Sequence, residues 1–160
     1  MLVNIRDAST AGNFSGTLDL SALRLWGERV FPAPVAVVGK LAHGHEQLVL
    51  DYTANYTLVG RCSRCLCDIS LNESASFSHS VEEDAGEDSD AAPAPGGMLD
   101  MAALASSDLM LELTDPPLCK EDCRGLCPQC GADQNTANCG CANQKKVDPR
   151  FAALLDYMDD

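Results

Sequence analysis

Basic and aromatic residues are both scarce in this chain of 160 residues. Only 11 Lys and Arg stand against 24 Asp and Glu, and the formal net charge of −13 excludes a protein that simply coats nucleic acid. Aromatic residues make up 5% of the chain, so a core must be mainly aliphatic. The first residues lack a basic stretch followed by an apolar one, and no apolar run is long enough to cross a bilayer. We therefore expect a cytoplasmic protein with no membrane contact.

The motifs of common catalytic sites are also missing. There is no Gly-rich phosphate loop, no Ser–His–Asp pattern and no H-E-x-x-H segment. His43 and His45 fall in a predicted turn, and His79 lies on a predicted strand without an obvious partner. The sequence therefore predicts a protein that is not an enzyme and has no small-molecule substrate.

Cysteine, in contrast, is abundant: six of the nine thiols lie between Cys119 and Cys141, and three lie in RCSRCLC. Disulfides rarely persist in the cytoplasm, and an odd number fits a closed disulfide framework badly. The segments CSRC and CPQCG each offer two thiols from one tight turn, as zinc sites do. A redox pair normally opens a helix in a βαβ unit, and an iron–sulfur cluster would use the same ligands. We expect zinc in a closed, structural role.

Two groupings of the thiols are open. One is a single split ribbon of Cys62 and Cys65 with Cys127 and Cys130. The other has two zinc ions and leaves only Cys67 free, and we prefer it because it leaves fewer thiols uncommitted. Its ligands are Cys62, Cys65, Cys119 and Cys123 for one ion, and Cys127, Cys130, Cys139 and Cys141 for the other.

Hydrophobic residues alternate with polar ones over 47–59 and 68–81, which predicts two half-buried strands with the first C-x-x-C at the tip of their hairpin. A further strand is predicted over 34–42. In the first of these segments the core-facing residues would be Leu48, Leu50, Tyr52, Ala54, Tyr56 and Leu58. We interpret residues 1–82 as an antiparallel sheet or partly open barrel, in which the fold of 14–34 stays undecided.

The second half of the chain differs in composition. Residues 83–97 are acidic and then rich in Ala, Pro and Gly, which predicts a disordered linker or long loop. A helix is predicted over 99–113 with Asp100 as its N-cap, although Asp108 interrupts its apolar stripe. Residues 98–160 would then hold this helix, the cysteine-rich zinc segment and a C-terminal helix over 148–158 that packs on the β part. The fold class is therefore α+β.

Several basic residues flank the cysteines. They either offset the charge of zinc-bound thiolates or form a local face that contacts RNA. The residues proposed for RNA contact are Arg61, Arg64, Lys120, Arg124, Lys145 and Lys146.

Four blocks carry a resemblance to a known family: RCSRCL, LTDPPLCKEDCRGLCPQCGADQN, NCGC and DPRFAALLDYM. Their order and spacing between Val35 and Met158 resemble the YceD family, the large ribosomal RNA subunit accumulation proteins of bacteria and chloroplasts. The resemblance implies one YceD-like domain with a role in accumulation of large-subunit ribosomal RNA. It also implies that Cys62, Cys65, Cys119 and Cys123 form one site, because some members lack the later cysteines. The chain departs from the family in Cys67, Gln134 and its very acidic linker.

Two function classes follow. The first is a non-enzymatic ribosome-biogenesis factor that contacts large-subunit ribosomal RNA or a basic ribosomal protein. The alternative is a thiol-based redox or metal-handling protein.

Overall fold

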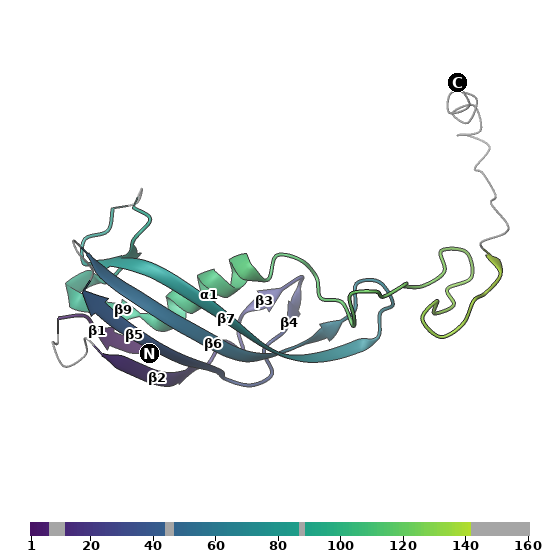
Figure 1. Cartoon of the computed structure of the whole chain (residues 1–160), viewed down its shortest axis with the longest axis horizontal. Coiled ribbons are helices and arrows are strands. Elements are labelled where there is room, and N and C mark those ends of the chain that lie inside the picture. Colours follow the sequence, from purple (N-terminus) through teal and green to yellow (C-terminus); the bar gives the residue numbers. More distant parts are fainter. Residues whose placement is uncertain (7–11, 44–46, 87–88, 142–160) are drawn as a thin grey trace, which may run out of the picture.

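A five-stranded sheet forms the body of the protein (Figure 1). The computed structural model describes residues 1–6, 12–43, 47–86 and 89–141. The strand order is β2-β5-β6-β7-β8, and every pair is antiparallel except β7 with β8. The strands are β2 (Asn13–Leu18), β5 (Val35–His43), β6 (Leu48–Arg61), β7 (Asp68–Glu82) and β8 (Ala92–Pro93). The predicted α+β class with a mainly antiparallel sheet is confirmed, and the sheet is not a closed barrel.

The long hairpin of β6 and β7 confirms the strands predicted from alternation. Its register runs from Leu48↔Val81 to Arg61↔Asp68, so the first C-x-x-C does lie in the loop at its tip. The expected inward side chains of β6 are buried from Leu50 to Leu58, whereas Leu48 is only partly buried. Pairing with β5 ends at Ala36↔Asn55. The outer part of the hairpin therefore projects beyond β5 and carries its loop away from the body of the sheet (Figure 1).

The undecided region 14–34 contributes an edge strand and a small hairpin. After β2, the strands β3 (Arg24–Leu25) and β4 (Glu28–Arg29) form a two-stranded ladder. Phe31 is buried and meets the ring of Tyr56 edge-on, with 5.6 Å between ring centroids. Val59 also donates its backbone N–H to the carbonyl of Val30. This segment therefore covers the outer part of β6 where β5 no longer does.

The expected linker over 83–97 is wrong for its second half. Ala91, Ala92 and Ala94 are buried, and β8 pairs with the end of β7. The backbone N–H of Ala94 donates to the carbonyl of Glu82 at 2.8 Å. The prediction failed because small Ala side chains resemble linker composition yet fit closely against a sheet, and Pro is tolerated on an edge strand.

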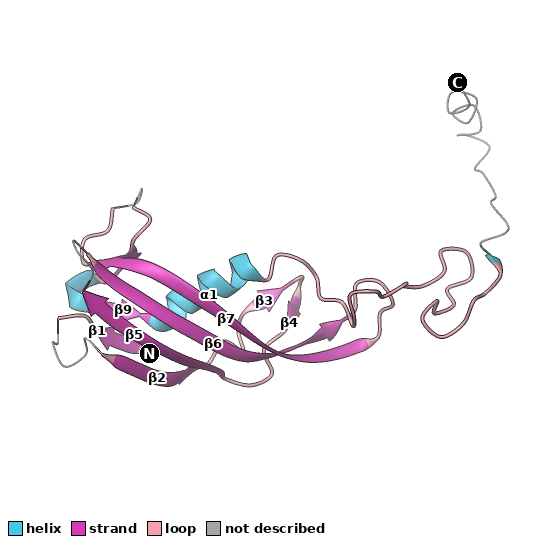
Figure 2. Cartoon of the chain, viewed as in Figure 1, coloured by secondary structure: helices cyan, strands magenta, loops and turns pink. Residues whose placement is uncertain are grey.

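Three further short elements lie outside the five-stranded sheet. The strand β1 (Leu2–Asn4) pairs with β9 (Met98–Asp100), and a 3-10 turn, η1 (Pro95–Gly97), precedes β9. The helix α1 (Met101–Glu112) follows directly and lies along one face of the sheet (Figure 2). The predicted N-cap is confirmed, since the side chain of Asp100 accepts the N–H groups of Ala102 and Ala103. The C-terminal helix predicted over 148–158 lies outside the described residues.

The buried carboxylate of Asp108 connects α1 to the sheet. It accepts the hydroxyl of Tyr52 on β6, and its Oδ2 lies 2.8 Å from Nε2 of His79 on β7. Asp108 is 7% exposed, and burial together with this hydrogen bond raises the pKa of Tyr52. The interruption of the apolar stripe is therefore a polar contact between helix and sheet, and the prediction that His79 has no partner is wrong.

Replacement of Asp108 tests this contact. We expect Asp108→Ala to lower the free energy of unfolding by about 1–3 kcal/mol, because the buried hydroxyl of Tyr52 loses its acceptor. Asp108→Asn keeps an acceptor oxygen and should cost less. Ser107→Ala, at an exposed neighbouring position, is the control and should change stability by less than about 0.5 kcal/mol in urea unfolding. Equal values for Asp108→Ala and Ser107→Ala would contradict the role given to Asp108.

Candidate metal centres

Eight of the nine cysteines gather in two groups of four thiols. Within each group all Sγ atoms lie within 4.8 Å of one another. Site 1 consists of Cys62, Cys65, Cys119 and Cys123, and site 2 consists of Cys127, Cys130, Cys139 and Cys141. The structure thus gathers the thiols as in the preferred two-site grouping. The pairs that the split ribbon would join lie in different sites.

The distances in site 1 fit one tetrahedral ion. Four thiolates at about 2.3 Å from a central zinc are about 3.8 Å apart. The Sγ atoms of Cys62 and Cys123 are 3.8 Å apart, and those of Cys65 and Cys119 are 3.6 Å apart. A polynuclear iron–sulfur cluster, with sulfide ions between its irons, needs thiols that are further apart. The arrangement therefore suits a single ion with four sulfur ligands and no open position.

Site 1 joins two distant parts of the chain. The hairpin loop supplies Cys62 and Cys65, and the segment after α1 supplies Cys119 and Cys123. Backbone hydrogen bonds accompany the thiols: Ser63 donates to the carbonyl of Pro117 at 3.1 Å. A small apolar cluster surrounds the site, with Ile69, Leu71, Leu118 and Leu126 as its members other than cysteine. The four thiols of site 1 and the backbone hydrogen bonds thus link the hairpin tip to the cysteine-rich segment.

Arg64 strengthens this link with its own side chain. Its guanidinium donates to the carbonyl of Cys123 at 3.0 Å and lies 3.4 Å from the carbonyl of Glu121. Its backbone carbonyl accepts the N–H of Leu126 at 3.1 Å. A side chain at Gly125, whose φ is +72°, would approach that carbonyl to 2.9 Å, so the close contact requires glycine. Arg64 therefore holds the loop of the second segment, a role that the sequence did not reveal.

The two C-x-x-C turns share one backbone pattern. Cys62 donates its N–H to the carbonyl of Cys67 at 2.9 Å, as Cys127 does to that of Ala132 at 2.8 Å. The residue after the second cysteine donates back to the first, from Leu66 in one turn and Gly131 in the other. Both pairs are therefore knuckles of the same construction, although only the second contains the glycine that usually follows.

Backbone N–H groups favour the thiolate form of the first cysteine in each knuckle. The N–H of Cys65 lowers the pKa of Cys62 to about 6. The N–H groups of Cys130 and Gln129 lower the pKa of Cys127 to about 6. The reason is that a donor aimed at sulfur stabilises its negative charge.

Cys119 and Cys141 show the opposite trend. Burial and hydrogen bonds with four neighbouring thiols raise the pKa of Cys119. Hydrogen bonds with Cys130 and Cys139 raise the pKa of Cys141 to about 12. Four adjacent thiols cannot all ionise alone, because like charges repel, and a divalent cation at the centre removes this conflict.

Site 2 is built from a short, turn-rich segment. Gly140, with φ of +69°, stands between Cys139 and Cys141 and lets both thiols turn toward one centre. This explains how the tight C-x-C spacing can supply two ligands. An isolated bridge between Leu126 and Asp133 closes the turn that carries Cys127 and Cys130.

Asn135, which lies between Cys130 and Cys139 in the chain, contacts site 1 and was not among the residues predicted from the sequence. Its side-chain amide donates to Sγ of Cys123 at 3.4 Å, and its Oδ1 accepts the backbone N–H of Arg124 at 2.9 Å. This donation lowers the pKa of Cys123, although burial acts in the opposite direction. Polar groups that orient metal ligands in this way typically tune metal affinity. The signal in the sequence was an Asn in a cysteine-rich turn, which is too common to single out.

The ninth thiol lies beside site 1. Cys67 is exposed, and its Sγ is 3.3 Å from that of Cys65. It is not one of the four thiols that surround a common centre. This position agrees with the two-site grouping, in which Cys67 is the one thiol outside both sites.

The basic residues expected to contact RNA have different surroundings. Arg124 is exposed, and Arg61 makes a long pair of 3.9 Å with Asp68. Lys120 pairs with Asp122 at 3.6 Å, with both side chains at least half exposed. Lys145 and Lys146 lie outside the described residues. Among the described candidates, Arg64 is the one whose side chain is occupied by backbone carbonyls.

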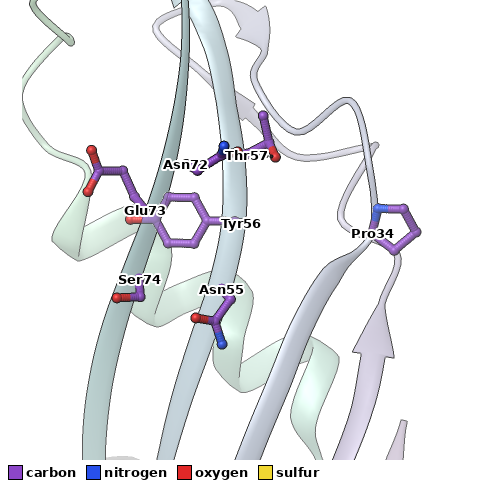
Figure 3. A pocket seen from close by; sticks show the side chains of 7 residues that line it. All are labelled: Pro34, Asn55, Tyr56, Thr57, Asn72, Glu73 and Ser74. Carbon is purple, nitrogen blue, oxygen red and sulfur yellow. Dashed lines mark hydrogen bonds between the residues drawn. The ribbon is translucent and has the colours of Figure 1, made fainter.

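The outer face of the sheet has a shallow polar hollow (Figure 3). Its volume is about 440 Å³, and it is lined by Pro34, Asn55, Tyr56, Thr57, Asn72, Glu73 and Ser74. Thr57 donates its hydroxyl to Oδ1 of Asn72 at 2.9 Å. Amide and hydroxyl groups dominate this lining, and it contains no histidine, cysteine, lysine or arginine. The hollow therefore offers no obvious acid–base pair.

No helix in the described part of the chain is long and apolar enough to cross a membrane.

Comparison with known proteins places the chain in a family. Uncharacterized proteins of Mycobacterium bovis and Mycobacterium tuberculosis are each 28% identical over 119 residues, which cover 71% of this chain and 56% of the relative. An uncharacterized protein of Mycobacterium leprae is 24% identical over 139 residues, or 83% of this chain and 61% of the relative. The chain thus spans a little more than half the length of these relatives. No solved structure shows a significant match.

The family model described as large ribosomal RNA subunit accumulation protein YceD matches residues 50–156. This range includes most of β6, all of β7, α1 and both four-thiol sites. The chain therefore belongs to the YceD family.

Proposed function

We propose that this protein is a non-enzymatic, cytoplasmic factor that supports accumulation of large-subunit ribosomal RNA during ribosome assembly. The observation that carries the proposal is the family match over residues 50–156. The two four-thiol sites support a binding role rather than catalysis, because a metal with four sulfur ligands keeps no position for water or substrate. In this proposal the sheet and the cysteine-rich segment act as one domain, joined through site 1.

The metal in both sites is proposed to be zinc, one ion in each. Zinc accepts four thiolates in a tetrahedron and has no redox chemistry of its own, which suits a structural site. The S···S distances of 3.6 and 3.8 Å in site 1 support this choice.

The direct partner is proposed to be large-subunit ribosomal RNA, and a basic ribosomal protein is the second option. The charge distribution supports a contact at the hairpin tip, where Arg61, Lys120 and Arg124 are exposed. The acidic residues that begin at Glu82 follow the other end of β7, which has 15 residues. At about 3.3 Å per residue these two regions are roughly 45–50 Å apart, well beyond the screening distance in physiological salt.

One observation favours the alternative of a thiol-based redox or metal-handling protein. The exposed thiol of Cys67 lies 3.3 Å from that of Cys65. It could replace Cys65 as a ligand of the metal. Metal that leaves readily and thiols that oxidise easily would support this alternative.

The metal content distinguishes the sites. We expect two zinc ions per chain in elemental analysis, and one each in Cys62→Ser and Cys127→Ser, because each variant removes a ligand from one site only. Cys67→Ser is the matched control and should keep both ions. Iron with visible absorbance would contradict the zinc assignment, and loss of both ions from either ligand variant would contradict independent sites.

Site 1 should also control how the cysteine-rich segment is held. We expect Cys62→Ser to speed proteolysis after Leu113, because the segment that carries Cys119 and Cys123 loses its main connection to the hairpin. Cleavage within α1 should not change, since that helix packs on the sheet through its own contacts. Cys67→Ser again serves as control. A digestion pattern identical to that of the unchanged protein would mean that site 1 does not hold the two parts together.

The cellular role can be tested by deletion of the gene and profiling of ribosomal particles during fast growth. We expect reduced large-subunit RNA and a lower ratio of large to small particles. Arg124→Glu should weaken an RNA contact, whereas neutralisation of the acidic residues in 82–90 should weaken contact with a basic ribosomal protein. Normal RNA levels and particle ratios in the deletion strain would overturn the assembly role.

A further inference from the structure

Two strained turns carry large apolar side chains toward the same notch. Trp26 has φ of 53° and Leu66 has φ of 62°, and these are the only residues other than glycine with positive φ in the described ranges. Trp26 occupies the first position of the two-residue turn between β3 and β4, where Asn or Gly is preferred. Leu66 occupies the position that Gly131 holds in the second knuckle, with φ of +73°. Both turns therefore carry a large apolar side chain at a position where Gly would adopt the same backbone conformation with less strain.

The notch is small and mainly apolar. Its volume is about 160 Å³, and Val30, Pro116 and Pro117 line it together with Trp26 and Leu66. Trp26 is 38% exposed and Leu66 is 60% exposed. The indole Nε1–H donates to the carbonyl of Thr114 at 3.3 Å, which holds the ring in place. The aromatic surface is thus exposed and already oriented before a ligand arrives.

Guanidinium groups lie near this surface: Arg61 lines the notch, and the adjoining β3–β4 ladder carries Arg24 and Arg29. Arg24 and Arg29 stand directly opposite each other in the ladder of β3 and β4, and opposed like charges destabilise a strand pair. Arg24 reaches the turn itself, where it donates to the carbonyl of Gly27 at 3.3 Å. Among the described residues, neither arginine has an acidic partner within 4.0 Å. An anion between them would remove the repulsion.

The notch also contains one charge of each sign. Arg61 lines it, and its pair with Asp68 is long and almost fully exposed, so the guanidinium is free to rearrange. Glu28 lines it as well and can accept a donor such as the amino group of a base. Glu28 also disfavours a simple anion at the centre of the notch, so phosphate fits outside it, beside Arg61 and the β3–β4 ladder.

We propose that this notch binds an unpaired base of single-stranded RNA, stacked on Trp26, with the adjoining phosphates at Arg24, Arg29 and Arg61. Proteins bind single strands by stacking a base on an exposed aromatic ring and placing cationic groups nearby for the phosphates. A protein segment would fill the apolar notch but would leave the opposed arginines without an anion. The inference rests on the proposed function, to which it adds a direct RNA contact.

The chain contains one Trp, so its fluorescence reports on this notch alone. The zinc-loaded protein is titrated at low salt with a single-stranded octamer of adenylate, and stacking should quench the fluorescence. A duplex RNA of the same length should not quench it, because its bases are already paired. Absence of quenching by the octamer, or equal quenching by the duplex, would overturn the proposal. So would quenching by a proline-rich or basic peptide in place of RNA.

Variants then separate stacking from charge in anisotropy measurements with a fluorescein-labelled octamer. We expect Trp26→Ala to weaken binding at least about fivefold, since stacking of one base typically accounts for that much or more. Trp26→Phe should keep part of the affinity. Arg29→Ala should weaken binding and lower the slope of log K against log salt by about 1. Leu111→Ala, at a residue of α1 that is 74% exposed, is the control and should bind like the unchanged protein.

A stability measurement distinguishes a binding role from a structural one. Leu66→Gly removes the strain of positive φ, so its thermal midpoint should not fall while its RNA affinity does. If Trp26→Ala and Leu66→Gly both bind the octamer like the unchanged protein, the proposal is wrong.

Complementation of the deletion strain keeps this test separate from that of the proposed function. Full rescue by Trp26→Ala would reject the notch and leave the assembly role intact. A deletion strain without a phenotype, together with normal RNA binding by the pure protein, would reject the assembly role and leave the notch.

Discussion

The register of β6 against β7 is the constraint on which the remaining structure depends. The two strands pair from Leu48↔Val81 to Arg61↔Asp68, and they continue beyond Asn55 of β6, where pairing with β5 stops. This overhang carries the first cysteine knuckle to the segment that follows α1. A shift of one residue would turn Leu50, Tyr52 and the other buried side chains toward solvent, so the core itself maintains the register. The geometry of site 1 is therefore set by burial of residues that lie far from it.

Hydrophobic burial alone is a weak explanation for the order of the cysteine-rich segment. The cluster around site 1 contains four buried residues, of which three are thiols and the fourth is Ile69. The main core lies elsewhere, between the sheet and α1. A segment with so little apolar surface normally needs covalent or metal crosslinks. Hydrogen bonds from Arg64 and Asn135 also hold Cys123, one to its carbonyl and one to its thiol.

The ends of the long hairpin differ in character. One end carries the metal sites, the notch of Trp26 and several exposed guanidinium groups, whereas the acidic residues after Glu82 follow the other. A net charge of −13 and an RNA contact are therefore compatible, because the acidic run that begins at Glu82 is remote from the proposed contact, and the nearer Asp68 and Asp122 are paired with Arg61 and Lys120. This separation also explains why overall composition is a poor guide to the partner of this protein.

The amino-acid sequence alone determined the strands with strict alternation, the N-cap at Asp100 and the gathering of paired thiols in two short segments, because these depend on neighbours within a few residues. It also carried the family resemblance, which the comparisons confirmed. Only the tertiary structure decided which knuckle faces Cys119, since that choice depends on how far β6 extends beyond β5. The sequence also could not predict three other features: the partner of His79, the burial of Ala92, and the notch that Trp26 and Leu66 line together. Each of them joins residues that are distant in the chain, and periodicity within one element contains no information about the element that packs against it.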